Sequence, residues 1–306
     1  MSIAEITTPR IIQHASRESW LLHRPSTLNG SELAAALGQS PWQSLFALWS
    51  EKVSGIREEI DSEAAEWGTI LEGPVLEAYA RKSGRKVERW NQLNTVVSPR
   101  YDWLRCTPDA TQIDDDKGPG TVQIKTTSAY LARDWKDDPP MHVQIQAQFE
   151  AWMMGMSYGT VAALIGGQKL VWHDFDVNMR FINAALKKLA EFWQCVQDQT
   201  PPEVDGSEST TNAIKRMYPI DEGGEIELND EHQKLVQRKA RLAERAKRLD
   251  AVKNEVDNRL KVALGDYTTG ILPSGQRVTY KAQTMPERTL AASTFRVLRI
   301  SKLKGE

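Results

Sequence analysis

The sequence has few of the residues that build disulfide scaffolds or zinc sites. Of its 306 residues two are cysteines, Cys106 and Cys195, and five are histidines, which are dispersed without the spacing of zinc ligands. No apolar run approaches the roughly 20 residues of a membrane span, and Met1–Trp20 lacks the apolar core of a signal peptide. We therefore expect reduced thiols, no membrane segment and a cytoplasmic protein.

The sequence also lacks the excess of basic residues that many nucleic-acid-binding proteins show. The net charge is −2, with 40% hydrophobic and 26% charged residues, which is ordinary for a globular protein. The distribution of charge matters more than its sum, and basic residues dominate from Tyr267 to Glu306. They are Arg277, Lys281, Arg288, Arg296, Arg299, Lys302 and Lys304, opposed by Glu287 and Glu306. A solvated tail explains this segment slightly better than a DNA contact does.

Hydrophobic periodicity predicts a mixed fold, in which helices pack on a sheet. The predicted helices cover residues 31–37, 44–52, 62–82, 143–156 and 177–197. The predicted strands cover residues 86–90, 103–107, 121–126, 160–165 and 169–176, and residues 114–120 form a hairpin loop by composition. This order predicts the α/β class with an α+β mixed sheet.

The C-terminal third has a different pattern. Residues 200–211 have the composition of a linker, and a long charged helix follows, which ends at Gly265. One apolar residue recurs in every heptad, at Leu228, Leu235, Leu242, Leu249, Val256 and Ala263. Such a narrow seam packs either on the same molecule or on another chain. We expect a core domain at 1–205 and an extension with the long helix and the basic tail at 206–306.

The most informative stretch is Cys106-Thr-Pro-Asp109 followed by Val122-Gln123-Ile124-Lys125. It predicts a strand that ends in an acid, a polar hairpin, and a second strand. Because alternate residues of a strand share a face, Gln123 and Lys125 would point together toward Asp109. An acid, an oxygen ligand and a lysine at one point suit metal-assisted phosphodiester hydrolysis. A plain hairpin is the alternative, and on this pattern alone it is the more common explanation.

Glu72 stands in the middle of the helix predicted at 62–82, flanked by apolar residues. A partly buried carboxylate needs a partner, and a divalent cation is one. The side chains of Glu72, Asp109 and Gln123 and the carbonyl of Ile124 could supply oxygen ligands. Lys125 would then lie beside the attacking water.

Two glutamines on the helix predicted at 143–156 are further candidates. Gln144 and Gln148 are four residues apart and share a helix face. A solvated polar stripe is an equally good interpretation of this pair.

In order and spacing these motifs resemble the phage lambda-type exonucleases, also called YqaJ-like viral recombinases, which have a restriction-endonuclease-like PD-(D/E)xK core. The resemblance extends over most of residues 1–200. The matching segments are Trp20 with Arg24, Asn29-Gly-Ser31-Glu32, Leu37-Gly-Gln-Ser-Pro-Trp42, Trp67-Gly68 with Glu72, Cys106-Thr-Pro-Asp109, Gln123-Ile-Lys125 and Gln144-Ile-Gln146.

The resemblance implies a deoxyribonuclease that digests one strand of linear duplex DNA in the 5′→3′ direction. It also implies a 3′ single strand as product, used by a phage annealing protein in homologous recombination inside a bacterial host. Family members are often ring-shaped, so a cyclic homo-oligomer around DNA is expected.

The resemblance further implies roles for single residues. Two Mg²⁺ or Mn²⁺ ions would lie on the positions of Glu72, Asp109 and Gln123, with Lys125 and Gln144 near the water nucleophile. Arg24, Ser31 and Thr107 match residues that hold the terminal 5′-phosphate. Without a role in binding phosphate, Arg24 would be an ordinary surface arginine and Ser31 a helix-capping serine.

The chain departs from the family pattern at Gln123, where an acid is expected. A carboxamide offers one neutral oxygen to a metal, so we expect weaker metal affinity and reduced turnover, with fold and DNA binding near normal. Natural drift and an engineered substitution both explain Gln123, and the intact remaining motifs favour the second. The rival functions are an endonuclease with the same core and a DNA-binding protein that has lost catalysis. A scaffold built on the long helix explains the motifs least well.

Overall fold

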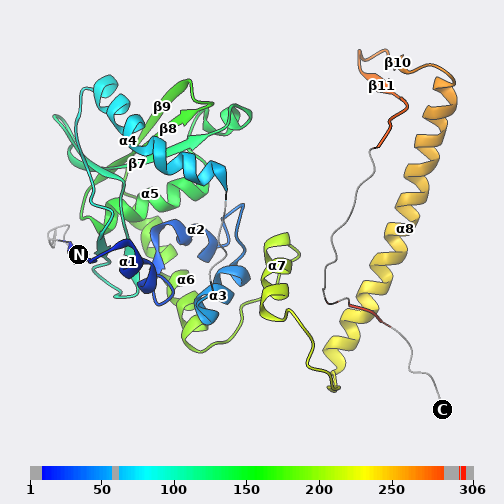
Figure 1. The fold of residues 1–306 in the computed structure, drawn as a ribbon, viewed down its shortest axis with the longest axis horizontal. Coiled ribbons are helices and arrows are strands. Elements are labelled where there is room, and N and C mark those ends of the chain that lie inside the picture. Colours follow the sequence, from blue (N-terminus) through cyan, green and yellow to red (C-terminus); the bar gives the residue numbers. More distant parts are fainter. Residues whose placement is uncertain (1–8, 57–61, 286–295, 297, 301–306) are drawn as a thin grey trace. The chain divides into compact units, whose positions relative to one another are not determined.

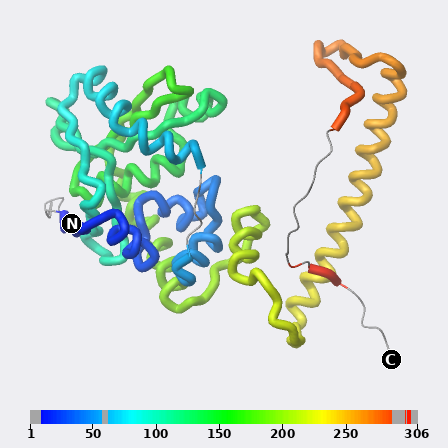
Figure 2. The backbone as a smooth tube through the Cα atoms, in the orientation of Figure 1, coloured from blue at the N-terminus to red at the C-terminus, as the bar shows by residue number. Residues whose placement is uncertain are grey.

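The structure is a computed structural model that describes residues 9–56, 62–285, 296 and 298–300. It divides into two compact units, Met1–Met217 and Tyr218–Glu306, which Figure 1 shows as a ribbon and Figure 2 as a backbone tube. Within the described ranges, no helix combines the length and the apolar character that a membrane span requires.

The elements of the first unit alternate between helix and strand. Its strands are β1 (Arg10–Gln13), β2 (Leu28–Asn29), β3 (Lys86–Arg89), β4 (Asn94–Val97), β5 (Leu104–Cys106), β6 (Ala110–Asp114), β7 (Gly118–Thr127), β8 (Tyr158–Ile165) and β9 (Lys169–Asp176). Its α-helices are α1 (Arg17–His23), α2 (Leu33–Ala36), α3 (Leu45–Ser54), α4 (Glu63–Ser83), α5 (Met141–Met153), α6 (Met179–Gln197) and α7 (Glu208–Met217), and its 3-10 helices are η1 (Gly30–Glu32) and η2 (Ala129–Trp135).

A five-stranded sheet with the order β3-β6-β7-β8-β9 forms the centre of the unit. Strand β7 pairs in parallel with β8, where Gln123 lies opposite Val161, and the other neighbouring strands pair antiparallel. This sheet mixes parallel and antiparallel pairs and carries helices on its faces. The predicted mixed α/β class is thereby confirmed.

Helices α4 and α5 cover opposite faces of this sheet (Figure 1). Val122 and Ile124 of β7 pack in a cluster with apolar residues of α4. The side chains of Gln123 and Lys125 point the other way, to hydrogen bonds with α5. The alternation along β7 therefore separates a packing face from a polar face, as the sequence predicts.

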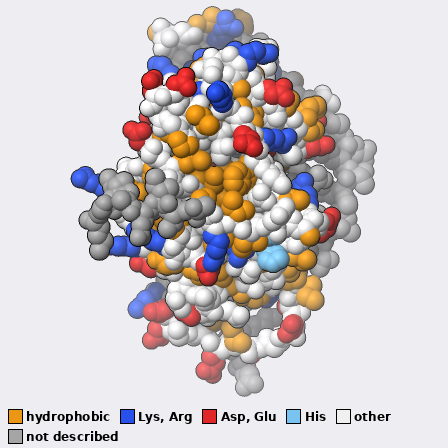
Figure 3. Space-filling view, turned by 90° about the vertical axis from the view of Figure 1, so that its left-hand side faces the viewer, with side chains coloured by type: hydrophobic (Ala, Val, Ile, Leu, Met, Phe, Trp, Pro, Cys, Tyr) orange, Lys and Arg blue, Asp and Glu red, His pale blue; other side chains and the backbone are white. Residues whose placement is uncertain are grey.

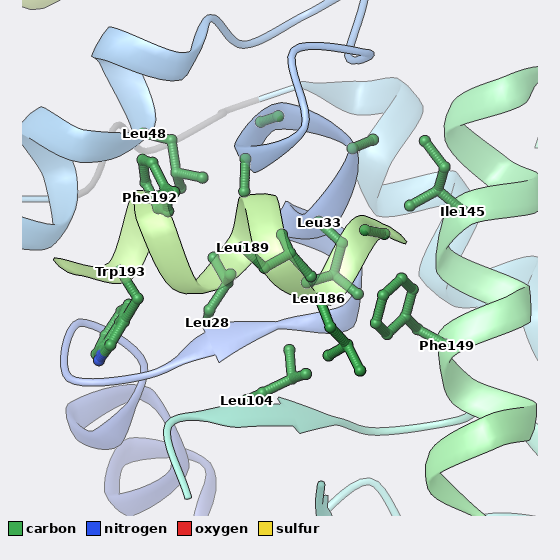
Figure 4. Packing of buried hydrophobic residues seen from close by; sticks show 14 of the residues in the cluster. Leu28, Leu33, Leu48, Leu104, Ile145, Phe149, Leu186, Leu189, Phe192 and Trp193 are labelled. Atoms are coloured by element: carbon green, nitrogen blue, oxygen red, sulfur yellow. The ribbon is translucent and has the colours of Figure 1, made fainter. Parts of the chain in front are cut away.

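A second, four-stranded sheet has the order β1-β4-β5-β2 and borders the larger hydrophobic core. In this core Leu28 of β2 and Leu104 of β5 lie side by side and pack with Leu186 and Leu189 of α6 and with Phe149 of α5 (Figure 4). Each such side chain contributes about 1.5–3 kcal/mol when it is buried. This packing fixes the β2–η1–α2 segment beside β5.

The second unit contains α8 (Asp230–Leu264) and the hairpin of β10 (Thr269–Ile271) and β11 (Arg277–Thr279). Helix α8 ends at Gly265, as predicted. The side chains of the heptad seam are exposed, for example at Leu235 and Leu249. Of the predicted basic tail, Arg288, Lys302 and Lys304 lie outside the described residues.

The predicted hairpin differs from the observed one. Strand β5 ends at Cys106 and belongs to the four-stranded sheet, so Asp109 lies between two sheets and not at the end of a hairpin strand. The hairpin is formed by β6 and β7, with Asp114 opposite Gly118. Pro108 has no N–H to extend the β5 ladder, and the chain passes there from one sheet to the other.

The boundary between the units also differs from the expected one at residue 205. Residues 208–217 form α7, which overlaps the predicted linker and belongs to the first unit. Thr210 Oγ1 donates to Ser44 Oγ at 2.7 Å, and Ala213 is buried in the larger core. These contacts hold α7 on the first unit, so the extension begins at Tyr218.

A polar network around Arg85, which directly precedes the edge strand β3, joins α4 to strands β6, β8 and β9. Its guanidinium donates to Asp114 Oδ2 at 2.6 Å, to Asp174 Oδ2 at 2.6 Å and to the Tyr79 hydroxyl at 2.8 Å. Thr160 Oγ1 adds a hydrogen bond to Asp174 Oδ1 at 2.7 Å. The Arg85 side chain is only 13% exposed, so its removal would leave two carboxylates poorly compensated.

We expect Arg85→Leu to lower the free energy of unfolding by about 2–4 kcal/mol, because breaking a largely buried ion pair leaves unpaired charge. Arg10→Leu is the matched control, since its pair with Asp102 is exposed (59% and 83%). The control should cost less than about 1 kcal/mol. Urea unfolding of the two variants measures the difference, and equal losses would contradict a structural role for this network.

Candidate active site

Asp109 lies where the two sheets meet, and its carboxylate caps the free edge of β7. Asp109 Oδ2 accepts hydrogen bonds from the Ile124 backbone N–H at 2.7 Å and from Gln123 Nε2. Burial raises the pKa of Asp109 to about 6; the positive charge of Lys125 opposes this rise and the negative charge of Glu72 adds to it. The predicted meeting of Asp109, Gln123 and Lys125 is therefore present in the structure.

A chain of hydrogen bonds runs from Lys125 through α5 back to Asp109. Lys125 Nζ donates to Gln146 Oε1 at 3.1 Å, and Gln146 Nε2 donates to Gln123 Oε1 at 3.1 Å and to Glu150 Oε1 at 2.8 Å. An ammonium group can only donate and an ionised carboxylate can only accept. The two charged ends therefore fix the orientation of both amides between them.

This orientation turns the oxygen of Gln123 away from Asp109 and presents its NH₂ group instead. The predicted role of Gln123 as an oxygen ligand beside Asp109 is not met in this arrangement. Among the described residues, no group of three or more His, Cys, Asp or Glu side chains is placed to hold a metal ion. The amide at position 123 leaves Asp109 and Glu72 as the paired acids of the predicted set.

Glu72 reaches the site from α4, on the opposite side of the sheet from α5. Its side chain is 17% exposed, which agrees with the predicted partly buried acid, and its Oε1 accepts from Arg89 Nη2 at 3.1 Å. The charge of Glu72 acts on Asp109 and raises the pKa of that residue. A buried acid whose ionisation a neighbouring carboxylate makes more costly is a fitting environment for a cation.

Gln144, the glutamine predicted for the site, forms its side-chain hydrogen bond elsewhere. Gln144 Nε2 donates to the Pro139 carbonyl at 2.5 Å, and Gln148 Nε2 donates to the Asp176 carbonyl at 2.9 Å, both away from Lys125. Gln146 takes the predicted place. Residues two apart on a helix lie about 200° apart around its axis, so Gln144 and Gln146 cannot serve the same face.

The face of α5 that meets the site carries His142, Gln146 and Glu150, at spacings of four residues. Burial and the charge of Lys125 lower the pKa of His142, which favours the neutral imidazole. The sequence reasoning missed all three residues. Their i, i+4, i+8 spacing was visible, but the Gln144 and Gln148 pair has the same spacing.

Glu150 is the most deeply buried acid of the cluster, with 1% of its surface exposed. Burial raises its pKa to about 8, and the negative charge of Asp109 adds to this rise. Gln146 satisfies Oε1, while Oε2 is buried without a hydrogen-bond partner.

The residues predicted to hold a 5′-phosphate form a second group around η1. Arg24 Nη2 lies 3.2 Å from Ser31 Oγ and 3.3 Å from Glu32 Oε1, and the guanidinium stacks over the Trp20 ring at 4.7 Å. Thr107 is half-buried directly after β5. The structure thus brings Arg24 and Ser31 together.

Glu32 is held from two sides and was not assigned a role from the sequence. Lys52 Nζ donates to Glu32 Oε2 at 2.7 Å and to the carbonyls of Arg24 and Thr27. Burial alone would raise the pKa of Glu32, but the charges of Lys52 and Arg24 lower it below its ordinary value. The ion pair of Lys52 with Glu32 joins residues 20 positions apart. No local sequence pattern therefore predicts it.

Gly30 brings the group around η1, which contains Arg24 and Ser31, close to the cluster around Asp109. A Cβ at Gly30 would lie 3.3 Å from Cys106 Cβ and 3.3 Å from Glu150 Oε1. The backbone that carries Ser31 is therefore packed directly against the acid of α5. The Arg24 group and the Asp109 cluster are neighbouring parts of one site.

Residues 19–157 match the YqaJ-like viral recombinase domain. Over this segment the chain is similar to that family. The uncharacterised protein YqaJ of Bacillus subtilis (strain 168) is 28% identical over 267 residues, which cover 85% of this chain and 82% of that protein. The segment 19–157 contains every predicted site residue, from Arg24 to Gln144.

Solved structures share the fold of the YqaJ-like domain. The alkaline exonuclease LHK-Exo from Laribacter hongkongensis has a TM-score of 0.50 and 16% identity, over 60% of this chain and 93% of that chain. The complex of LHK-Exo with dAMP gives the same TM-score and identity over 66% and 98%. The first unit therefore has an exonuclease-like fold.

Burial of Glu150 in the YqaJ-like domain predicts a specific pH dependence of stability. Its folded pKa of about 8 lies above the ordinary value of 4.5, so its contribution to stability is complete below about pH 4.5 and is lost as the pH rises toward 8. Glu150→Gln stays neutral and avoids this loss. Its melting temperature relative to wild type should be higher at pH 9 than at pH 5 by about 2–4 °C or more.

Melting curves in EDTA at the two pH values measure this change, with the exposed Glu191→Gln as a matched control. A constant offset between wild type and Glu150→Gln at both pH values would show that Glu150 does not titrate in this range.

Proposed function

We propose that this chain is a Mg²⁺-dependent 5′→3′ exonuclease that digests one strand of linear duplex DNA. The single observation that carries the proposal is the network of Asp109, Gln123 and Lys125 with Glu72 beside it, inside a YqaJ-like domain with an exonuclease-like fold. These are the positions at which the family resemblance places acids and a lysine around the scissile phosphate.

The residues present fit a divalent cation. Mg²⁺ is usually held by one or two carboxylates, with waters and substrate phosphates completing its shell. Asp109 and Glu72 offer two carboxylates, and burial together with the negative charge of Glu72 raises the pKa of Asp109. In the proposal these two acids and the Ile124 carbonyl hold the metal, with Mn²⁺ as a substitute and a second ion as in the family.

Bound Mg²⁺ would polarise the scissile phosphate and lower the pKa of a bound water. The chain's own contribution is position and charge. Lys125 is half-buried, and the Gln146 oxygen orients its ammonium group near Asp109. A fixed ammonium group there would stabilise negative charge that develops on the attacking water or on the phosphate.

The Arg24 group suits a terminal phosphate. Arg24 and Lys52 bring two positive charges beside the single negative charge of Glu32. The Ser31 hydroxyl adds a neutral donor beside the guanidinium, a combination that binds phosphate well. A pocket of this kind is useful only at a 5′ end, which favours an exonuclease over an endonuclease with the same core.

The remaining parts of the proposal follow from the family. The product is a 3′ single strand for a phage annealing protein in recombination, and the enzyme acts as a cyclic homo-oligomer around duplex DNA in a bacterial host. LHK-Exo, which has the same fold, was crystallised with dAMP, and a nucleotide therefore suits this site as a product.

A second candidate is a DNA-binding protein without catalysis. The observation that favours it is the Gln123 amide, which donates to Asp109 and leaves two acids where the family pattern has three. Figure 3 shows acidic and basic side chains interspersed on one face of the molecule, which does not favour general binding to DNA on that face.

Gln123→Glu should raise Mg²⁺-dependent digestion of 5′-phosphorylated linear duplex by about tenfold or more, because a carboxylate binds the cation through two charged oxygens. A time course of digestion with wild type and variant measures this effect. Closed circular duplex of the same sequence is the control substrate.

Three results would change the conclusion. Equal activity of both proteins would show that position 123 is not a ligand. Inactivity of both with Mg²⁺ and Mn²⁺, with DNA binding intact, would favour the DNA-binding protein. Equal activity on circular and linear DNA would favour the endonuclease.

Ser31→Ala and Arg24→Gln should reduce the preference for 5′-phosphorylated over 5′-hydroxyl ends by about tenfold, because they remove donors to the terminal phosphate. Rates on the two substrates give the preference as a ratio, which is insensitive to a general loss of activity. Arg10→Gln, a change at an exposed arginine, should leave the ratio unchanged. An unchanged ratio in both test variants would place the end-binding pocket elsewhere.

A further inference from the structure

The acid that the family pattern has at position 123 is absent, yet a buried carboxylate lies one side chain away. Gln146 Nε2 donates both to Gln123 Oε1 at 3.1 Å and to Glu150 Oε1 at 2.8 Å. A single amide nitrogen therefore separates the Glu150 carboxylate from the Gln123 side chain. Glu150 is also near enough to Asp109 for the charge of Asp109 to act on it.

One oxygen of this carboxylate lacks a partner. Glu150 is 1% exposed, and its Oε2 is buried without a hydrogen bond. Within the described part of the chain, no lysine or arginine forms an ion pair with Glu150. A buried carboxylate without full compensation is costly, and a bound cation is one way in which proteins compensate it.

The surroundings of Glu150 are built to leave room for its carboxylate. Gly30 of η1 approaches so closely that a Cβ there would lie 3.3 Å from Glu150 Oε1 and 3.7 Å from Cγ. On the other side Gln146 holds Oε1 in place. The acid is thus fixed between η1 and the Asp109 cluster.

We propose that Glu150 supplies the third carboxylate when a divalent cation binds this chain, in place of the acid that is missing at position 123. In the arrangement of the described residues without the cation, the three acids are not yet grouped around one point. The inference rests on the proposed function, because the cation site is the one that Asp109 and Glu72 begin. Hard cations accept carboxylate oxygens from any element that reaches them, and α5 faces the polar side of β7 here. The competing explanation for the buried Glu150 is that it is protonated and serves only to pack the interior.

The test is the affinity of the full chain for Mn²⁺ without DNA, measured from the electron paramagnetic resonance signal of free Mn²⁺ during a titration at pH 8. Glu150→Gln should weaken the affinity by about tenfold or more. The double variant Gln123→Glu with Glu150→Gln returns an acid to β7 and should restore the affinity nearly to that of wild type. Glu191→Gln, the same change at an exposed position, should have no effect.

Melting temperatures give a second readout, because a ligand that binds the folded state raises them. Mn²⁺ should raise the melting temperature of wild type and of the double variant more than that of Glu150→Gln. If Glu150→Gln does not fold, Glu150→Asp keeps the charge, shortens the side chain and should show the same loss of Mn²⁺ affinity.

Wild-type Mn²⁺ affinity in Glu150→Gln, or in Glu150→Asp where that variant is used, would overturn the proposal. A folded double variant that fails to regain affinity would overturn it as well. A different result bears on the proposed function alone: if the Mn²⁺ affinities follow the expected order but neither wild type nor Gln123→Glu digests DNA, the exonuclease proposal fails and the role of Glu150 stands.

Discussion

The hydrogen bond from the Ile124 N–H to the Asp109 carboxylate is the contact on which the site depends. Pro108 ends the β5 ladder, and the chain then crosses to the five-stranded sheet. The carboxylate that follows occupies the ladder position beside β7. One acid therefore both joins the sheets and stands at the centre of the polar cluster. A change at Asp109 would affect folding and chemistry together, so it is a poor probe of either.

The amide at Gln123 stabilises this cluster of charged side chains. A carboxylate at this position would face Asp109 as a like charge, which is unfavourable in a buried site. The amide instead donates to Asp109 and accepts from Gln146. The charges of Lys125 and Asp109 then fix a single arrangement of hydrogen bonds. The amide that stabilises the cluster also turns its oxygen away from Asp109.

The sequence predicts the position of a site residue correctly where a single helix or strand determines which way its side chain points. Alternation along β7 places Gln123 and Lys125 on one face, and the flanking valine and isoleucine fix which face is buried. On α5 the prediction fails, because glutamines occur on two faces and only the contact with β7 selects between them. Lys52 and Glu32 meet across three segments, a contact that no periodicity contains. Likewise the assignment of α7 to the first unit depends on Ala213 entering a core formed by distant residues.

The charges around η1 bear on the choice between cutting at ends and cutting internally. Lys52 is buried and bonded to two backbone carbonyls as well as to Glu32, so it stabilises the loop and cannot reach a substrate. It also neutralises Glu32, which would otherwise cancel the charge of Arg24. The Arg24 side chain lies beside an exposed Ser31 and pairs with Glu32, so its guanidinium is held in one place next to that hydroxyl. An internal cut needs no such fixed charge beside the proposed metal-binding acids, because the neighbouring phosphates of a continuous strand can occupy many positions.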